Sequence, residues 1–230
     1  MTILRSLILL IFGTAAWAEL PALEPRAGGA WDAVGRINRA GMVNRGMCSG
    51  TLIAPSVVLT AAHCTPQGDL SESLQTRMFV AGWAQGDFAD AARIVGGVRH
   101  PAYGIGRDHD PRFDLGLIFL ERPLEGVTPL ALTLPIDAPF ALLGYHRGRP
   151  HMLSGSLDCP LIRETTDLFN LDCPVVSGNS GGPVLQQDGE GNWGVVAVVS
   201  SQVVKTALAV KIANWVRETV EAHRAKAPSP

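Results

Sequence analysis

A series of short apolar runs separated by turn-forming residues is the feature that most narrows the folds open to this chain. The runs are Ala33–Ile37, Cys48–Ile53, Val57–Ala61, Met78–Ala81, Leu115–Leu120, Val184–Leu185 and Val195–Val199. Short apolar runs bounded by turn residues are typical of β-strands. A parallel α/β fold would place an amphipathic helix of about 10–15 residues between strands, and most of the chain has no such pattern. The sequence therefore predicts an all-β fold.

One helix is expected near the end of the chain, within Ala209–His223. Apolar residues recur there with mostly helical spacing, at Val210, Ile212, Ala213, Trp215, Val216 and Val220. The charged residues Lys211, Arg217, Glu218 and Glu221 lie on the other faces. We expect this helix to pack on the outside of the β-structure, and residues 225–230 to form a disordered tail.

Residues 1–18 have the pattern of a signal peptide. Arg5 stands in a short polar start, an apolar run follows over Leu7–Phe12, and small residues flank Trp17, which predicts cleavage before Glu19. The apolar stretch is shorter than the roughly 20 residues of a membrane-spanning helix, so a membrane anchor is the weaker interpretation. We expect export to the periplasm or the extracellular space, with no membrane span after signal removal. Residues 19–32, rich in Pro, Ala and Gly, predict an irregular lead-in over the surface.

Composition and charge exclude several functional classes. The chain has 230 residues, a formal net charge of -2 and 47% hydrophobic residues, so it can bury a large core. It has no basic excess, and we expect no nucleic-acid partner. No internal repeat of about 20–50 residues is visible, which argues against propellers and solenoids.

A histidine at the end of an expected strand is the first candidate for chemistry. The segment Cys48–Cys64 consists of two apolar stretches around a Pro-Ser turn, and it ends at His63 beside Cys64. A general base must be held in one place, and a cross-link next to the histidine would restrict the loop that carries it. Taken alone, a single histidine is more often structural than catalytic.

An aspartate and a serine are the other candidates. Asp114 precedes the apolar run Leu115–Leu120, and taken alone it is better explained as a turn residue than as a buried partner. Ser180 lies in the glycine-rich segment Ser177–Val184, which taken alone is a flexible turn. Glycines let backbone N–H groups turn inward around a serine, and acyl transfer needs such donors for the negative oxygen of its intermediate. Gly178 and Ser180 are the candidate oxyanion donors.

The three segments together resemble the motifs of the trypsin/chymotrypsin-like serine proteases. The matching stretches, in the family's order, are Leu59–Cys64, Asp114–Ile118 and Gly178–Pro183, and the resemblance covers about residues 33–222. The order His, Asp, Ser differs from that of subtilisins and of α/β-hydrolases. The resemblance implies a double six-stranded antiparallel β-barrel with a C-terminal α-helix, over residues 33–224, with the three residues in the cleft between the barrels.

The same resemblance implies a role for each residue. Ser180 attacks the scissile carbonyl, His63 takes its proton and passes it to the leaving amine, and Asp114 holds the imidazole in the correct tautomer. This chemistry implies no cofactor and no metal. It implies a polypeptide substrate, with a protein inhibitor as a further candidate partner, and we expect a monomer.

Four cysteines can form two disulfides in an oxidising compartment. Three pairings are open, and the local ones, Cys48–Cys64 and Cys159–Cys173, are favoured because each ties a short segment beside a candidate catalytic residue. Metal binding is the competing interpretation, but no CxxC or HxxxH spacing is present. The place of Cys173 before Ser180 is similar to the bacterial secreted branch that includes glutamyl endopeptidases, in which the Cys159–Cys173 pairing is expected.

Several positions depart from the trypsin subgroup. Asn179 stands where an aspartate would receive the ammonium group created by zymogen cleavage, so activation of that type at the segment Arg26–Gly29 is not expected. Pro174 occupies the place of the acid at the base of the primary pocket, so a preference for Arg or Lys is not supported.

The expected pocket residues are Pro174, Val175, Val199 and Ser200. Val199 aligns with the histidine that glutamyl-specific relatives use, which leads to the hypothesis of a small or apolar substrate side chain. Ser200 is expected at the pocket edge, where it would also support Asp114.

The function predicted from the sequence is that of a secreted or periplasmic serine endopeptidase. The alternative is a catalytically inactive homologue that acts as a binding module, although the three candidate residues and the glycine turn are all present. A periplasmic quality-control protease of the HtrA type is a third interpretation. The cysteines argue against it, and so does the short stretch after residue 222, which leaves no room for a peptide-binding PDZ domain.

Overall fold

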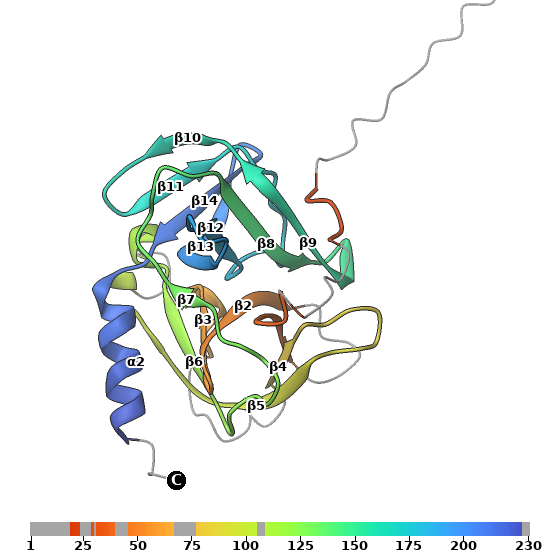
Figure 1. Cartoon of the computed structure of the whole chain (residues 1–230). Helices are drawn as coiled ribbons and strands as arrows, with labels where there is room; N and C mark the ends of the chain where they lie inside the picture. Colours follow the sequence, from red (N-terminus) through yellow and green to blue (C-terminus); the bar gives the residue numbers. More distant parts are fainter. Residues whose placement is uncertain are drawn as a thin grey trace, which may run out of the picture.

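Two mainly antiparallel β-sheets and a C-terminal helix make up the described chain (Figure 1). The structure is a computed structural model, and it describes residues 19–23, 29, 31–39, 46–66, 77–104 and 109–226. The predicted signal peptide, residues 1–18, and residues 227–230 lie outside the described residues. In the part of the chain that is described, no helix is long and apolar enough to cross a membrane.

The first sheet closes into a six-stranded barrel with the order β1-β2-β3-β6-β5-β4. Its strands are β1 (Val34–Arg39), β2 (Met47–Ala54), β3 (Val57–Thr60), β4 (Arg77–Ala81), β5 (Asp90–Arg99) and β6 (Gly116–Leu120). Large apolar side chains from these strands fill the barrel, among them Leu52, Val58, Phe79, Ile94 and Ile118, all of which are buried. Burial of these side chains supplies the main driving force for this half of the molecule.

The second sheet has eight strands, with the order β10-β11-β14-β13-β12-β8-β9 and β7 paired in parallel with β13. Its strands are β7 (Ala131–Leu132), β8 (Phe140–His146), β9 (Arg149–Cys159), β10 (Leu161–Glu164), β11 (Leu168–Leu171), β12 (Pro183–Gln187), β13 (Trp193–Val203) and β14 (Thr206–Lys211). The all-β class with a C-terminal helix is confirmed. The second sheet has eight strands instead of the six expected for the second barrel, because the short strands β7 and β10 extend it.

The C-terminal helix α2 spans Asn214–Lys226, so it begins later in the chain than the helix expected within Ala209–His223. Thr206–Lys211 is strand β14, which pairs with β11 and with β13. Two neighbouring strands satisfy its backbone groups, and this tertiary pairing outweighs the local helical spacing of its apolar residues. The prediction that the helix packs outside the β-structure is correct: Val216 and Val220 are buried, and His223 stacks on Phe119 of β6. The helix also includes residues 225 and 226 of the expected tail.

The first residues of the expected lead-in pair with the second sheet instead of lying loosely over it. Leu20 is completely buried in the core of that sheet. Gly155 N donates to Pro21 O at 2.9 Å, and Leu23 N donates to Leu153 O at 2.9 Å. The free edge of β9 provides hydrogen-bond partners for this segment, in which Leu20 is buried and Pro21 and Ala22 are exposed.

Candidate active site

His63 and Asp114 form a hydrogen-bonded pair at the ends of two neighbouring strands of the first barrel. His63 lies in the 3₁₀ turn Ala62–Cys64, directly after β3, and Asp114 follows the 3₁₀ turn Pro111–Phe113 and precedes β6. The two Asp114 oxygens accept from His63: Oδ1 from the backbone N at 3.0 Å, and Oδ2 lies 2.8 Å from Nδ1. Because β3 and β6 pair antiparallel, the end of one meets the start of the other, which explains the meeting of residues so far apart in sequence.

Asp114 is only 3% exposed, and its surroundings keep it charged. Burial alone raises the pKa of a carboxyl, but hydrogen bonds from His63 and from Ser200 outweigh this effect, and the pKa of Asp114 lies below its ordinary value. Ser200 Oγ donates to Asp114 Oδ2 at 2.6 Å, as expected for this serine. An ionised carboxylate accepts the proton on Nδ1 of His63, which leaves Nε2 as the basic nitrogen of the neutral ring.

Ser180 lies in the same cavity as this pair. The cavity has a volume of about 420 Å³, and its lining includes His63, Asp114, Ser180 and Ser200. The Ser180 hydroxyl donates to Ser200 O at 3.3 Å, and no hydrogen bond between Ser180 and His63 is found in the described part of the chain.

Three amides of the segment Ser177–Val184, those of Ser177, Gly178 and Ser180, have no protein acceptor among the described residues. The carbonyl of Ser177 accepts from Arg147 N at 3.0 Å, and that of Asn179 accepts from Gly182 N at 2.9 Å. Asn179 N donates to Val176 O at 3.0 Å. Within the described residues, the N–H groups of Gly178 and Ser180 have no protein acceptor. The two predicted oxyanion donors are thus among the amides of this turn that have no acceptor in the described structure.

Glycine is required at two points of this turn. Gly178 has φ +111°, and an added Cβ would lie 2.8 Å from the Cα of His146. Gly181 has φ +82°, and a Cβ there would overlap Thr60 Oγ1 and Ser49 O. Both positions combine a backbone conformation that side chains rarely adopt with a neighbour that leaves no room.

Two of the predicted pocket residues are buried apolar side chains in the cavity wall. Val175 and Val199 line the cavity together with Ser200, as expected. Pro174 is half-buried and is not among the residues that line the cavity, and its assignment to the substrate pocket stays a prediction. The neighbouring Cys173 is tied to Cys159.

No pattern in the sequence singles out several other lining residues, among them Tyr103, His109 and Gln202. Tyr103 and His109 lie between β5 and β6, and Gln202 lies near the end of β13. Loop side chains of this kind reach a site only through the tertiary fold, so no local pattern indicates them.

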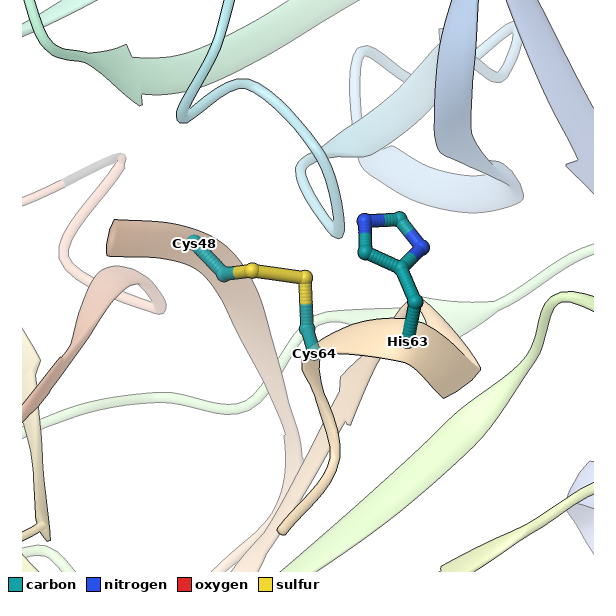
Figure 2. A group of neighbouring side chains, drawn as sticks. All are labelled: Cys48, His63 and Cys64. Atoms are coloured by element: carbon teal, nitrogen blue, oxygen red, sulfur yellow. A yellow bond between two sulfur atoms is a disulfide. The ribbon is translucent and has the colours of Figure 1, made fainter. Parts of the chain in front are cut away.

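Both predicted disulfides are present, Cys48–Cys64 and Cys159–Cys173. Figure 2 shows the first one joining β2 to the turn that carries His63, with the imidazole beside it. Cys48, His63 and Cys64 place possible metal-ligand atoms within 4.8 Å of one another, but disulfide sulfurs are not thiolates and do not offer the usual ligand. The cluster is a cross-link that restrains the histidine turn.

Two β-sheets with a His–Asp pair and a serine in a glycine-rich turn beside one cavity define a protein of the serine protease class. Comparison with known proteins agrees, because residues 48–198 match the family described as "Trypsin-like peptidase domain". The chain belongs to this family. The prediction of a trypsin-like serine protease is confirmed at the level of the family.

Individual relatives are distant. Rat (Rattus norvegicus) "Serine protease 23" is 28% identical over 163 residues, which cover 60% of this chain and 42% of the relative. Mouse (Mus musculus) "Serine protease 56" is 33% identical over 127 residues, covering 55% of this chain and 19% of the relative. The chain thus matches less than half the length of each curated relative. The crystal structure of the thermostable serine protease AL20, from an extremophilic microorganism, has a TM-score of 0.67 at 16% identity, covering 86% of this chain and all of that one.

Proposed function

We propose that this chain is an active endopeptidase that cleaves peptide bonds through an acyl-enzyme on Ser180. The observation that carries the proposal is the buried Asp114 carboxylate, hydrogen-bonded to Nδ1 of His63 in the cavity that also holds Ser180. A carboxylate in this position fixes the ring so that Nε2 can accept a proton. A structural histidine would have no need of a buried, ionised partner at the edge of a cavity.

The proposed reaction has two half-reactions. Ser180 Oγ attacks the substrate carbonyl while its proton passes to His63 Nε2, and the new oxyanion accepts hydrogen bonds from the N–H groups of Gly178 and Ser180. The intermediate collapses, the C–N bond breaks, and His63 gives the proton to the leaving amine. Water then attacks the acyl-enzyme with His63 as base, which releases the acid and restores Ser180.

We further propose that the primary pocket takes a small or apolar side chain. Val175 and Val199 are each at most 2% exposed, and both line the cavity. Among the described lining residues, Asp114 is the single carboxylate, and its oxygens are occupied by His63 and Ser200. No free acid is then left in the described wall to pair with a substrate Lys or Arg.

We also propose that the protein is exported and loses residues 1–18. The pattern of those residues supports this, and so do the two disulfides, because paired cysteines persist in oxidising compartments. N-terminal sequencing of the protein recovered from the compartment outside the cytoplasm tests the proposal, and a mature chain that begins at Glu19 is expected. A full-length chain retained in the cytoplasm would contradict it.

Fluorophosphonate labelling of the purified protein tests the proposed activity. We expect labelling at Ser180, located by mass spectrometry, with no labelling of Ser180→Ala. A peptide library should show cleavage after small or apolar residues by the wild type alone. A folded wild type that neither reacts with the probe nor cleaves the library would instead support the alternative, an inactive homologue that binds a partner.

A further inference from the structure

Ser49, which lies in β2 of the first barrel, contacts the glycine-rich turn of the second sheet. Its hydroxyl donates to Gly178 O at 2.9 Å and accepts from Tyr145 N at 2.8 Å. Its backbone N donates to Ser180 O at 2.8 Å. Ser49 is completely buried, so water cannot replace these hydrogen bonds. One residue of one barrel therefore holds the carbonyls of both predicted oxyanion donors in the other.

Asn179, between those two donors, completes the arrangement from within the turn. Its side chain is completely buried, with Nδ2 donating to Tyr145 O at 3.2 Å and Oδ1 accepting from Val176 N at 2.9 Å. Ser49, Gly178, Asn179 and Tyr145 thus form a closed ring of hydrogen bonds and covalent bonds. A neutral amide satisfied on both sides needs no ammonium partner.

The ring of hydrogen bonds restrains the backbone at Gly178, which has no Cβ to limit its rotation. With φ +111° and no Cβ, this residue can rotate its two peptide planes more freely than any other. The plane before it is held by the Arg147–Ser177 hydrogen bond, and the plane after it is held by Ser49. Removal of the Ser49 hydroxyl would leave the plane after Gly178 held only by the hydrogen bond from Asn179 N to Val176 O, and would leave two buried polar groups, Tyr145 N and Gly178 O, without this partner.

We propose that Ser49 and Asn179 are positioning residues that keep the Gly178 and Ser180 amides directed into the cavity. The inference rests on the proposed function, because it assigns these amides to the oxyanion of the reaction. The turn then needs no cleavage-generated N-terminus to become competent. The hydrogen bonds of Ser49 link the first barrel to the second sheet, so this part of the restraint on the donors lasts only while the barrel and the sheet stay docked.

The test compares Ser49→Ala with Thr51→Val in the mature protein. Thr51 lies on the same strand, is equally buried and has a hydroxyl without a hydrogen-bond partner in the described structure, which makes it a matched control. We measure kcat and KM on a peptide substrate, the Ki of a peptide boronic acid that forms a tetrahedral adduct with Ser180, and the unfolding midpoint. Asn179→Asp, which places an oxygen against Tyr145 O, is the second variant.

We expect Ser49→Ala to lower kcat by about 10- to 100-fold and to raise the boronate Ki by a similar factor, with KM changed by less than about threefold. Thr51→Val should change kcat, KM and Ki by less than about twofold. If Ser49→Ala does not fold, Asn179→Asp should show the same division between kcat and KM.

A lower unfolding midpoint with unchanged kcat and boronate Ki would show that Ser49 is merely structural and would overturn the proposal. A wild type that is not labelled at Ser180 would refute the proposed function, and this inference with it. A labelled wild type with a fully active Ser49→Ala would refute the positioning role alone.

Discussion

Replacement of Asp114 by asparagine tests how the buried carboxylate controls the imidazole. The carboxylate accepts three hydrogen bonds, from His63 N at 3.0 Å, from His63 Nδ1 at 2.8 Å and from Ser200 Oγ at 2.6 Å. Asparagine offers one acceptor oxygen and one donor NH₂ group, so one of the two positions that now accept must become a donor. The side chain is nearly isosteric, and the surrounding packing should be kept.

The two placements of the new amide have different costs. With its nitrogen at the Oδ1 position, it faces the backbone N–H of His63, which leaves a buried donor unpaired at a cost of about 1–3 kcal/mol. With its nitrogen at the Oδ2 position, Ser200 Oγ can accept instead of donate, and His63 Nδ1 becomes an acceptor. The second placement avoids the penalty, but it moves the ring proton to Nε2, where it prevents proton transfer from Ser180.

We therefore expect Asp114→Asn to lower kcat about 10,000-fold, equivalent to about 5.5 kcal/mol of lost transition-state stabilisation. KM and the unfolding midpoint should change little, because the substrate contacts and the core remain. Steady-state hydrolysis of a peptide substrate measures the effect, with circular dichroism as the folding control. A folded variant that retains more than a tenth of the wild-type kcat would show that Asp114 does not set the tautomer of His63.

Two further predictions concern stability. Asp90 accepts from both terminal nitrogens of Arg122, and these hydrogen bonds hold its pKa well below the ordinary value, so its stabilising effect is complete near neutral pH and is lost as the pH falls below about 4. Asp90→Asn should lose up to about 1 kcal/mol in urea unfolding at pH 7, because the pair is exposed to solvent, and should lose less at pH 3; a loss that grows as the pH falls would contradict this prediction. Leu20→Ala should lose about 2–5 kcal/mol in the same assay, whereas a loss below about 1 kcal/mol would mean that residues 20–23 do not dock.

The strands that the sequence predicted correctly are those with uninterrupted apolar runs. Val57–Thr60 and Gly116–Leu120 are buried along almost their whole length and were predicted from their apolar runs, whereas Phe140–His146, which is buried throughout, was missed. Strand β9 was missed, because its residues Arg149–Cys159 alternate irregularly between exposed and buried and include polar side chains. Strand β10 is exposed at every residue, so no apolar pattern marks it.

The site residues also divide into those that a local motif indicates and those that no local motif indicates. His63, Asp114 and Ser180 could be predicted because each stands in a local motif, and the structure brings all three to one cavity. Pro174 was placed in the pocket by counting back from Ser180, and a count cannot show which way the backbone turns after a disulfide-linked cysteine. The disulfide pairs could be predicted from the sequence because both join cysteines that are close in the chain, at sequence separations of 16 and 14.

The contacts of Ser49 could not be predicted from the sequence, and the reason is physical. Its hydroxyl meets residues 96 and 129 positions away, and a serine after a cysteine carries no periodic or turn signal that marks it. Its importance arises only when the two barrels dock and exclude water from the contact, because a hydroxyl that bridges two peptide groups in solvent contributes little. The catalytic motifs supply the reacting groups, whereas the orientation of the amides depends on this contact between barrels. A variant that loosens the docking should therefore lose kcat before it loses the His63–Asp114 pair, which lies entirely within the first barrel.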